Sequence, residues 1–549
     1  MNITLTLKIA TIILLCMVTA KAMFSQFAVF NPAEFEKNEG LLMTWAYEPG
    51  LDTLMANITK VAQQTAKVWI SYNPENTAVD TIIIRDFILS QGASSDNLFF
   101  IPALNETSWI RDFGPNVLYG NFGQGNQRYL LDMRYSGYGR PNDDSFPVQL
   151  SGLWGWTRVD LDLEAEGGNL LFDGLTRGFA TTRIQQQNPE LSASMIRNML
   201  IDKFNLMDFT FLQSLTNSGG GNWQHADMFM KVLDYETLLV SSYPDSLPYH
   251  NILEFNIMIL EGLSNHFNKP YRIIRIPAPP KADGTFAISQ NDEMRTYTNS
   301  LIINNTIIVP SYGISSYDDQ AAQIYTEAMP GYKIIMVDAR YISQINGGIR
   351  RITKEVPAPL FMRIIHRKVT GVQEYSPEMY LYSNCESNSG IQGMWLYYKV
   401  NDEEKYNKVP VYMACPQNIG IIENLKPGDK VSYYLEGVSA GGATMTYPGG
   451  APAANFTFWY ESVVGNESII AHRSDLRLIP ISNTGNFILS GSNLPETGII
   501  QVIDLSGQLL YQANVHANSV IDSNLKAGVY IVNFLSGNSR FTSKLLVVN

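Results

Sequence analysis

Residues 109–115 read Trp109-Ile110-Arg111-Asp112-Phe113-Gly114-Pro115. Glycine permits sharp changes of backbone direction and proline cannot donate a backbone hydrogen bond, so the Gly-Pro step predicts an abrupt turn. The turn presents two charged side chains, Arg111 and Asp112, at one place. A single pair of this kind is most often a surface ion pair, so its meaning depends on the motifs that accompany it.

Two further motifs follow along the chain. One is Glu166-Gly167-Gly168-Asn169, with Asp173-Gly174 close behind, and the other is His225-Ala226-Asp227. Paired glycines allow close backbone approach and can direct a carboxylate out of a loop. The stretch from His225 to Val232 has a strand-like pattern, and residues two apart share one face of a strand. His225 and Asp227 are therefore expected to present an acid–base group and an anion to one ligand.

The sequence contains no recognisable metal or cofactor motif. His225 and Asp227 have no further ligands at the usual zinc spacings, and neither a phosphate-binding loop nor a Gly-x-Ser-x-Gly turn occurs. The formal net charge is -12, so the chain lacks the excess of basic residues that is typical of nucleic-acid-binding proteins. This acidity could attract a cationic substrate or serve only solubility. We therefore expect no metal, no cofactor and no nucleic-acid partner.

Residues 27–357 alternate helical and strand-like patterns, which is typical of an α/β domain. Apolar residues recur at helical spacing from Leu51 to Ala62, and Val68–Tyr72 follows as a strand. Ser300–Val309 predicts a hairpin that turns at Asn304-Asn305. Further helices are predicted over residues 192–204, 251–267 and 318–329.

The pattern changes near residue 358. From 358 to 462, short strands separated by Gly, Asn and Pro clusters predict an immunoglobulin-like β-sandwich. Residues 475–549 again contain only short strands and predict a small C-terminal β-domain. Apolar residues make up 45% of the chain and charged residues 16%, a composition that favours a folded protein over a disordered one.

The first 22 residues have the order of a secretion signal peptide. Lys8 supplies the positive charge, residues 9–20 form the apolar run, and Ala20-Lys21-Ala22 resembles a cleavage site. The apolar run is too short to span a membrane as a helix. In an oxidising compartment, Cys385 and Cys415 are expected to form a disulfide, and two unpaired buried thiols are the alternative.

The three motifs, in this order, resemble the agmatine deiminase family. The export signal and the trailing β-domains look more like its secreted branch, the bacterial peptidylarginine deiminases. Further runs that match this branch are Arg140-Pro141-Asn142-Asp143-Asp144, Tyr297-Thr298-Asn299-Ser300 and Ala328-Met329-Pro330-Gly331-Tyr332. The resemblance covers most of residues 30–357. It implies the family's pentein-like fold, an α/β propeller of five pseudo-symmetric modules around an acidic pocket.

The resemblance also implies a chemistry. Carboxylates bind the forked N–H donors of a guanidinium, a thiolate attacks its central carbon, and a histidine transfers protons. Asp112 and Asp227 would hold the guanidinium, and His225, oriented by Glu166, would move protons. The implied substrate contacts are Trp109, Arg140, Glu166 and Asn299. Asp112, Glu166, His225, Asp227 and Asn299 are expected to converge on one concave site. Tyr138 replaces a second arginine of the secreted branch, which weakens any specificity for C-terminal arginine.

The segment that carries the family's nucleophile is altered here. The family pattern Gly-Gly-x-Ile-His-Cys-Ile-Thr-x-x-x-Pro is matched by residues 347–357, with Arg350 and Arg351 at the His and Cys positions. Arginine does not deprotonate in proteins and cannot act as the nucleophile. The leading interpretation is a guanidinium-binding, catalytically impaired protein. A working deiminase and a non-enzymatic binder of arginine-containing peptides are the alternatives.

Arg351 prompts a further hypothesis, because it lies on the segment that would face the carboxylates. A permanent cation there could occupy the guanidinium pocket in bidentate contact with Asp112 or Asp227. The alternative is an Arg351 side chain that extends into solvent.

The last domain resembles the type IX secretion sorting domain of Bacteroidetes-type bacteria. The matching runs are Pro480–Asn483, Val502–Gly507, Leu525–Tyr530 and Lys544–Val548. An ordinary additional β-domain is the alternative. The resemblance implies contact with the type IX secretion machinery and a secreted or cell-surface location. The expected ligand is an arginine-type small molecule or peptide.

Overall fold

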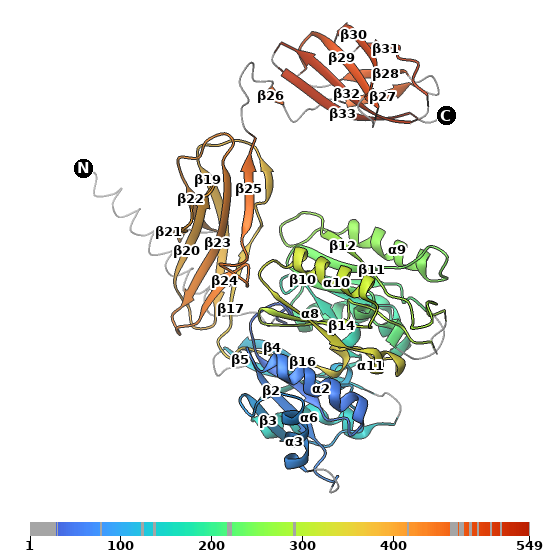
Figure 1. The fold of residues 1–549 in the computed structure, drawn as a ribbon, viewed down its shortest axis with the longest axis vertical. Helices are drawn as coiled ribbons and strands as arrows, with labels where there is room; N and C mark the ends of the chain where they lie inside the picture. Colours follow the sequence, from blue (N-terminus) through green and yellow to red (C-terminus); the bar gives the residue numbers. More distant parts are fainter. Residues whose placement is uncertain are drawn as a thin grey trace, which may run out of the picture. The chain divides into compact units, whose positions relative to one another are not determined.

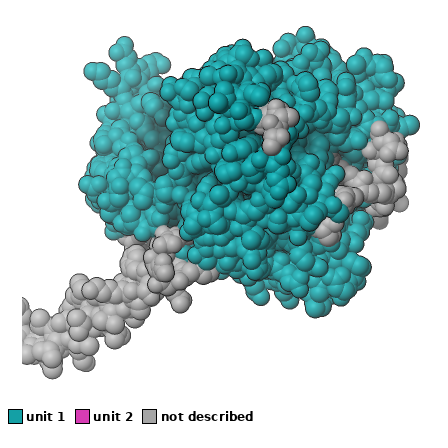
Figure 2. Space-filling model, turned by 90° about the horizontal axis from the view of Figure 1, so that it is seen from below, with its two compact units in different colours: residues 1–425, 430–459 teal, residues 426–429, 460–549 magenta. Residues whose placement is uncertain are grey.

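The structure is a computed structural model of the chain. It describes residue 29 and the ranges 31–76, 80–121, 126–135, 139–216, 222–288, 292–413, 417–461, 470–471, 477–481, 486–490, 494–504, 508–516, 519–526, 528–537 and 539–547. The expected secretion signal, residues 1–22, lies outside the described residues. No helix in the described ranges is long and apolar enough to cross a membrane. The chain forms two compact units, residues 1–425 with 430–459 and residues 426–429 with 460–549. Figure 2 shows the first of them in teal.

Five small sheets hold the strands described between residues 38 and 357. Their strands are β1 (Asn38–Thr44), β2 (Lys67–Tyr72), β3 (Leu98–Pro102) and β16 (Lys354–Pro357); β4 (Asn116–Asn121), β5 (Asn126–Arg134) and β6 (Arg158–Glu164); β7 (Leu171–Phe172), β8 (Arg177–Thr181) and β9 (Asp208–Leu212); β10 (Met230–Asp234), β11 (Thr237–Ser242) and β12 (Arg272–Pro277); β13 (Leu301–Ile303), β14 (Thr306–Ser311) and β15 (Lys333–Asp338). In each sheet, two neighbouring strands run antiparallel. One of these two strands also pairs with a further strand that runs parallel to it.

Helices connect the strands of these sheets (Figure 1). They are α2 (Pro49–Ala62), α3 (Thr81–Ser90), α4 (Ile110–Phe113), α5 (Pro141–Asp144), α6 (Phe146–Trp154), α7 (Arg183–Gln187), α8 (Ala193–Phe204), α9 (His250–Glu261), α10 (Ser315–Ala328) and α11 (Arg340–Gln344). In α2 the apolar residues predicted from their spacing, including Leu51, Met55 and Ile58, are buried in the core. Full burial of such a side chain contributes about 1.5–3 kcal/mol.

Most predicted elements of this region are present, and one helix is shorter than predicted. The hairpin of β13 and β14 turns at Asn304, whose φ of 53° is the left-handed conformation that asparagine tolerates well. The helix predicted over residues 251–267 ends at Glu261. Gly262 follows it as the C-cap, and the chain then folds back through a bridge between Ser264 and Pro270.

The first sheet is completed by the last strand of the region. β16 pairs antiparallel with β1, in a register that sets Leu42 opposite Lys354 and Asn38 opposite Pro357. The turn Arg350–Ile352 immediately precedes β16. This strand pairing therefore positions the segment that carries the two arginines.

Residues beyond 358 in the first unit form two sheets without helices (β17–β25 in Figure 1). Their strands are β17 (Met362–His366), β18 (Gly371–Gln373), β19 (Met379–Ser387), β20 (Ile391–Val400), β21 (Asn407–Pro410), β22 (Asn418–Ile422), β23 (Lys430–Ser439), β24 (Thr444–Tyr447) and β25 (Phe456–Tyr460). Cys385 lies on β19, where burial raises the pKa of its thiol to about 12. Cys415 lies outside the described residues, so the disulfide stays a prediction.

The second unit contains only strands among its described residues. They are β26 (Ile470–Ala471), β27 (Arg477–Ile481), β28 (Asn486–Ser490), β29 (Thr497–Asp504), β30 (Leu509–His516), β31 (Val520–Ile521), β32 (Gly528–Ser536) and β33 (Ser539–Val547). They form one sheet in the order β26-β33-β32-β29-β30 and another in the order β27-β28-β31. Alternating buried residues such as Ile500 and Val502 on β29 build its core.

Candidate functional site

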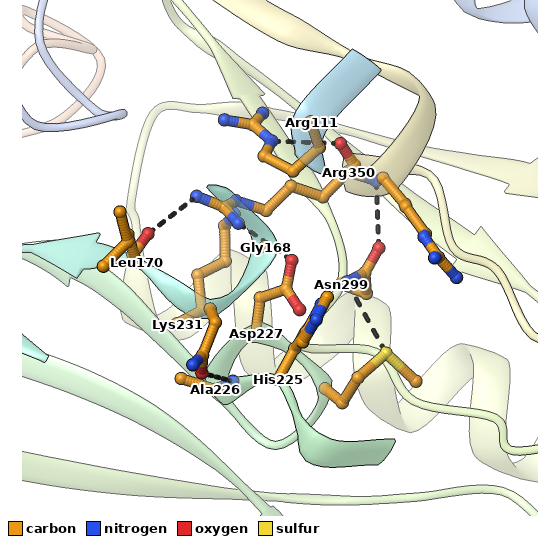
Figure 3. A network of polar contacts seen from close by, with 12 residues as sticks. Arg111, Gly168, Leu170, His225, Ala226, Asp227, Lys231, Asn299 and Arg350 are labelled. Atoms are coloured by element: carbon orange, nitrogen blue, oxygen red, sulfur yellow. Dashed lines mark hydrogen bonds and ion pairs between the residues drawn. The ribbon is translucent and has the colours of Figure 1, made fainter. Parts of the chain in front are cut away.

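The three sequence motifs and the arginine segment meet at one site. Each contributes a short helical turn: α4, Gly167–Asn169, Ala226–Met228 and Arg350–Ile352. Figure 3 shows His225, Asp227, Asn299 and Arg350 gathered around Gly168. The structure thus brings together five residues predicted for the site, Asp112, Glu166, His225, Asp227 and Asn299, all of which are buried.

Gly168 allows the motifs to approach one another closely. Its backbone N–H donates to Asp112 Oδ1 at 3.2 Å. A Cβ atom at this position would lie 2.7 Å from His225 Nδ1 and 2.8 Å from Asp112 Oδ1. Any other residue would therefore push these two side chains apart, which explains the paired glycines of the motif.

The local structure around His225 differs from the prediction. Residues Ala226–Met228 form a 3-10 turn, and the strand begins only at Met230. The turn is held by the Asn169 side chain, whose Oδ1 accepts the backbone N–H of Ala226 at 3.1 Å. His225 and Asp227 still reach the same site, but His225 does so from the N-cap of the turn and Asp227 from its middle residue.

His225 lies between two carboxylates. Its Nε2 is 2.9 Å from Glu166 Oε2, and its Nδ1 is 3.7 Å from Asp112 Oδ1. Burial alone would lower the pKa of His225, but Glu166 and Asp112 outweigh it and raise the pKa above its ordinary value. Burial likewise opposes ionisation of Glu166, and the charges of His225 and Arg183 nevertheless hold its pKa low. The geometry keeps a protonated imidazole against an ionised carboxylate.

This pair gives a pH-dependent contribution to stability. Because the folded-state pKa of His225 is raised, its contribution is complete below the ordinary value of 6.5 and is lost as the pH rises through the raised pKa. Glu166→Gln should therefore reduce the unfolding free energy more at pH 6 than at pH 8. The expected difference is about 1.4 kcal/mol for each unit by which the pKa of His225 falls. NMR titration measures the pKa of His225, and urea unfolding between pH 6 and pH 8 measures the unfolding free energy.

Glu39→Gln is the matched control for this test. Glu39 pairs with Lys67 and Arg128 and not with a histidine. The Glu39→Gln substitution should change the unfolding free energy by the same amount at pH 6 and at pH 8. A Glu166→Gln variant with the same flat profile would contradict the charged His225–Glu166 pair.

Arg350 forms the interior contacts of the arginine segment. Its Nη1 donates to Asp227 Oδ2 at 2.8 Å and its Nε to Glu34 Oε2 at 3.0 Å. Its backbone N–H donates to Asn299 Oδ1 at 3.0 Å. The residue is 5% exposed. One of the two carboxylates expected to hold a guanidinium therefore already binds one.

Arg351 engages the other carboxylate. Its Nε donates to Asp112 Oδ2 at 2.8 Å, and its Nη1 donates to the carbonyl of Asn346 at 2.9 Å. The guanidinium carbon lies 4.4 Å from the centre of the Trp109 ring, a cation–π arrangement. The side chain is 16% exposed and does not extend into solvent. Its contact with Asp112 uses one oxygen, where a bidentate pair was expected.

Arg140 lies at the margin of this group. Its Nη1 donates to Tyr135 Oη at 3.4 Å. Burial raises the pKa of Tyr135, the charge of Asp112 raises it further, and the charge of Arg351 opposes this rise. Tyr138, the departure noted in the sequence, lies outside the described residues.

Several residues of the site were not predicted. Glu34 accepts from Lys231 Nζ at 2.6 Å as well as from Arg350, and these cations overcome its burial and lower its pKa to about 2. Arg183 and Gln187 donate to Glu166. The run of two arginines signalled a cationic segment, but no motif marks Glu34. Within the described ranges, no cluster of His, Cys, Asp or Glu side chains is arranged to hold a metal ion.

Comparison with known families agrees with this geometry. The sequence profile of the Porphyromonas-type peptidyl-arginine deiminases matches residues 30–357. The chain belongs to this family. An agmatine deiminase-type protein of Yersinia pestis is 24% identical over 361 residues, covering 61% of this chain and 96% of the relative. A Marinomonas protein of the same type is 24% identical with the same coverage.

Solved structures of deiminases share the fold of this region. The agmatine deiminase of Enterococcus faecalis superimposes with a TM-score of 0.52 at 19% identity, covering 60% of this chain and 96% of that chain. An arginine deiminase-type protein from Porphyromonas gingivalis gives 0.51 at 21% identity, covering 60% and 98%. The α/β deiminase fold predicted from the motifs is thus confirmed.

A second profile, the secretion system C-terminal sorting domain, matches residues 479–549. The predicted sorting domain is confirmed. It indicates type IX secretion, so the deiminase-family protein is secreted or displayed at the cell surface.

Proposed function

We propose that this protein is an exported, non-hydrolytic member of its family, a pseudoenzyme whose guanidinium-binding carboxylates are occupied by its own arginines. The observation that carries the proposal is the pairing of Arg351 with Asp112 and of Arg350 with Asp227. In this proposal Asp112 and Asp227 hold internal guanidinium groups in place of a substrate.

The proposal is further supported by the chemistry of position 351. A guanidine hydrolase of this type needs a thiolate, and the arginine here has no lone pair available for attack. Cys385 lies on β19 in the sandwich, and even as a free thiol it would be a poor nucleophile, because burial raises its pKa to about 12. The pair of His225 and Glu166 remains, but it has no covalent intermediate to protonate.

The finer domain organisation is part of the proposal. We infer that the five repeated sheets are the modules of a pentein-like propeller over residues 27–357. The helix-free strands of residues 358–462 would form the immunoglobulin-like sandwich, cross-linked by a disulfide bond between Cys385 and Cys415. Residues 475–549 would form the sorting domain, and residues 1–22 the signal peptide.

A second candidate function is binding of an arginine-type ligand. Arg351 is the more exposed of the two arginines and holds Asp112 through one oxygen, so an incoming guanidinium could displace it. Trp109 would then stack on the ligand, and Arg140 at the margin would meet a carboxylate. Calorimetric titration with agmatine, arginine and an arginyl peptide distinguishes this binder from a protein with a closed site.

The purified protein should release no citrulline-type product or ammonia from agmatine, arginine or arginyl peptides. The physical reason is the missing thiolate together with the occupied carboxylates. The measurement is a colorimetric ureido assay, with the agmatine deiminase of Enterococcus faecalis as the positive control on agmatine.

Two variants sharpen this assay. Combining Arg351→Cys with Arg350→His restores the family's residues and should recover measurable turnover only if the rest of the machinery is intact. Product formation by the unmodified protein that His225→Ala abolishes would overturn the proposal and establish a deiminase with another nucleophile.

A further inference from the structure

A small cavity adjoins the arginine segment inside the deiminase region. Its volume is about 60 Å³. Its charged and amide lining includes Glu34, Arg111, Asn116, Arg350, Lys354 and Glu355. A space of this size holds a few water molecules or one ion the size of a halide.

Lys354 reaches this cavity from β16. The residue is 5% exposed, and its Nζ donates to Asn116 Oδ1 at 3.0 Å. Among the described residues, no carboxylate forms an ion pair with Lys354, although the other buried cations of this region have one. A protonated amine has three N–H donors, and the described contacts use only one of them.

Asn116, at the start of β4, adds a second donor. It is 7% exposed, and its Nδ2 has no hydrogen-bond partner among the described residues. A buried N–H group without an acceptor is unfavourable. Two residues from different strands therefore line the same small cavity with unused N–H donors: Asn116 through Nδ2, and Lys354 through the N–H bonds that do not reach Asn116 Oδ1.

The charges around the cavity leave one cation unmatched. The network contains four cations and three carboxylates: Arg111, Lys231, Arg350 and Lys354, with Glu34, Asp227 and Glu355. The carboxylates are already engaged, since Glu355 binds Arg111 through both oxygens at 2.7 and 2.8 Å. Glu34 is shared between Lys231 and Arg350. Lys354 is the member of this set with no carboxylate partner among the described residues, so its protonated form would carry the surplus positive charge.

We propose that this cavity is a binding site for one small monovalent anion of halide size, held by Lys354 Nζ and Asn116 Nδ2. The anion accepts the two unused donors and balances the surplus charge of the network. Burial lowers the pKa of Lys354 well below its ordinary value, and Arg111 lowers it further. An anion beside the amine acts in the opposite direction and favours its charged form.

Halide-dependent stability tests this site in the full chain. At constant ionic strength, replacing sodium gluconate with sodium bromide should raise the Tm of the first unit by about 1–3 °C, and the rise should grow with the logarithm of the bromide concentration once it exceeds the Kd, as expected for one binding site. Lys354→Met should abolish the halide-dependent rise. Lys60→Met, at an exposed lysine at the end of α2, is the matched control and should retain it.

Crystals of the unmodified chain grown with bromide provide a test that needs no variant. An anomalous peak is expected between Lys354 Nζ and Asn116 Nδ2. The proposal is overturned if no peak is found there, or if the Tm of the unmodified protein is the same in gluconate and bromide. An equal bromide response in Lys354→Met and Lys60→Met overturns it as well, and water then fills the cavity.

Discussion

Arg350→Ala is expected to destabilise the first compact unit by about 3–5 kcal/mol, because it leaves buried carboxylates without their cation. Asp227 loses its 2.8 Å ion pair, and Glu34 keeps only Lys231. Neither carboxylate can recover its hydration, since both lie at a site where Arg350 itself is 5% exposed. Urea unfolding of the full chain, compared with the unmodified protein, measures the loss.

Arg340→Ala is the matched control for this change. Arg340 forms an ion pair with Asp338 on the surface, where the side chain is 59% exposed. Exposed pairs contribute about 0–1 kcal/mol, so the same deletion there should have little effect. If Arg350→Ala also costs less than 1 kcal/mol, Arg350 does not neutralise the site. Adding Asp227→Asn to Arg350→Ala should recover part of the lost stability.

Arg351→Ala should cost about 2–4 kcal/mol and open a site for free guanidinium. The variant loses the ion pair to Asp112 and the stacking on Trp109, and it leaves a space of the shape that a guanidinium fills. Millimolar methylguanidinium should therefore raise the Tm of Arg351→Ala and leave the Tm of the unmodified protein unchanged. Thermal unfolding with and without this ion measures the rescue.

A second substitution identifies the source of this rescue. Adding Asp112→Asn to Arg351→Ala removes the carboxylate that would bind the added ion. The double variant should no longer respond to methylguanidinium, and its stability should exceed that of Arg351→Ala alone. Equal rescue of both variants would show that the ion binds elsewhere and that Arg351 is not an occupant of the pocket.

Much of the fold and the grouping of the motifs follow from local sequence patterns. The apolar spacing of α2 and the Asn304-Asn305 turn are signals within a few residues, and the structure confirms both elements. The motif residues meet because each lies on a short turn next to a glycine or a strand end. The family profile matches residues 30–357, the region that contains these motifs.

The remaining features depend on contacts between distant residues. The turn at Ala226 is held by Asn169, 57 positions earlier, so its own strand-like pattern was misleading. Glu34 binds Arg350, 316 positions later, and lies in no motif. The spacing of two adjacent arginines also cannot show that each binds a different carboxylate. Such pairings depend on the tertiary structure, and the local sequence around each residue gives no signal for them.

The pairing of β16 with β1 has a consequence for how the chain folds as it is synthesised. Residues 354–357 complete the first sheet, so the two arginines reach the acidic centre only after almost the whole region has been made. Contacts of such long range form late, because the entropy of loop closure must be overcome first. Until then Asp112 and Asp227 lack the guanidinium partners that Arg351 and Arg350 supply. We therefore expect a chain that ends before Arg350 to be less compact at this centre and more readily cleaved by proteases than the full-length chain.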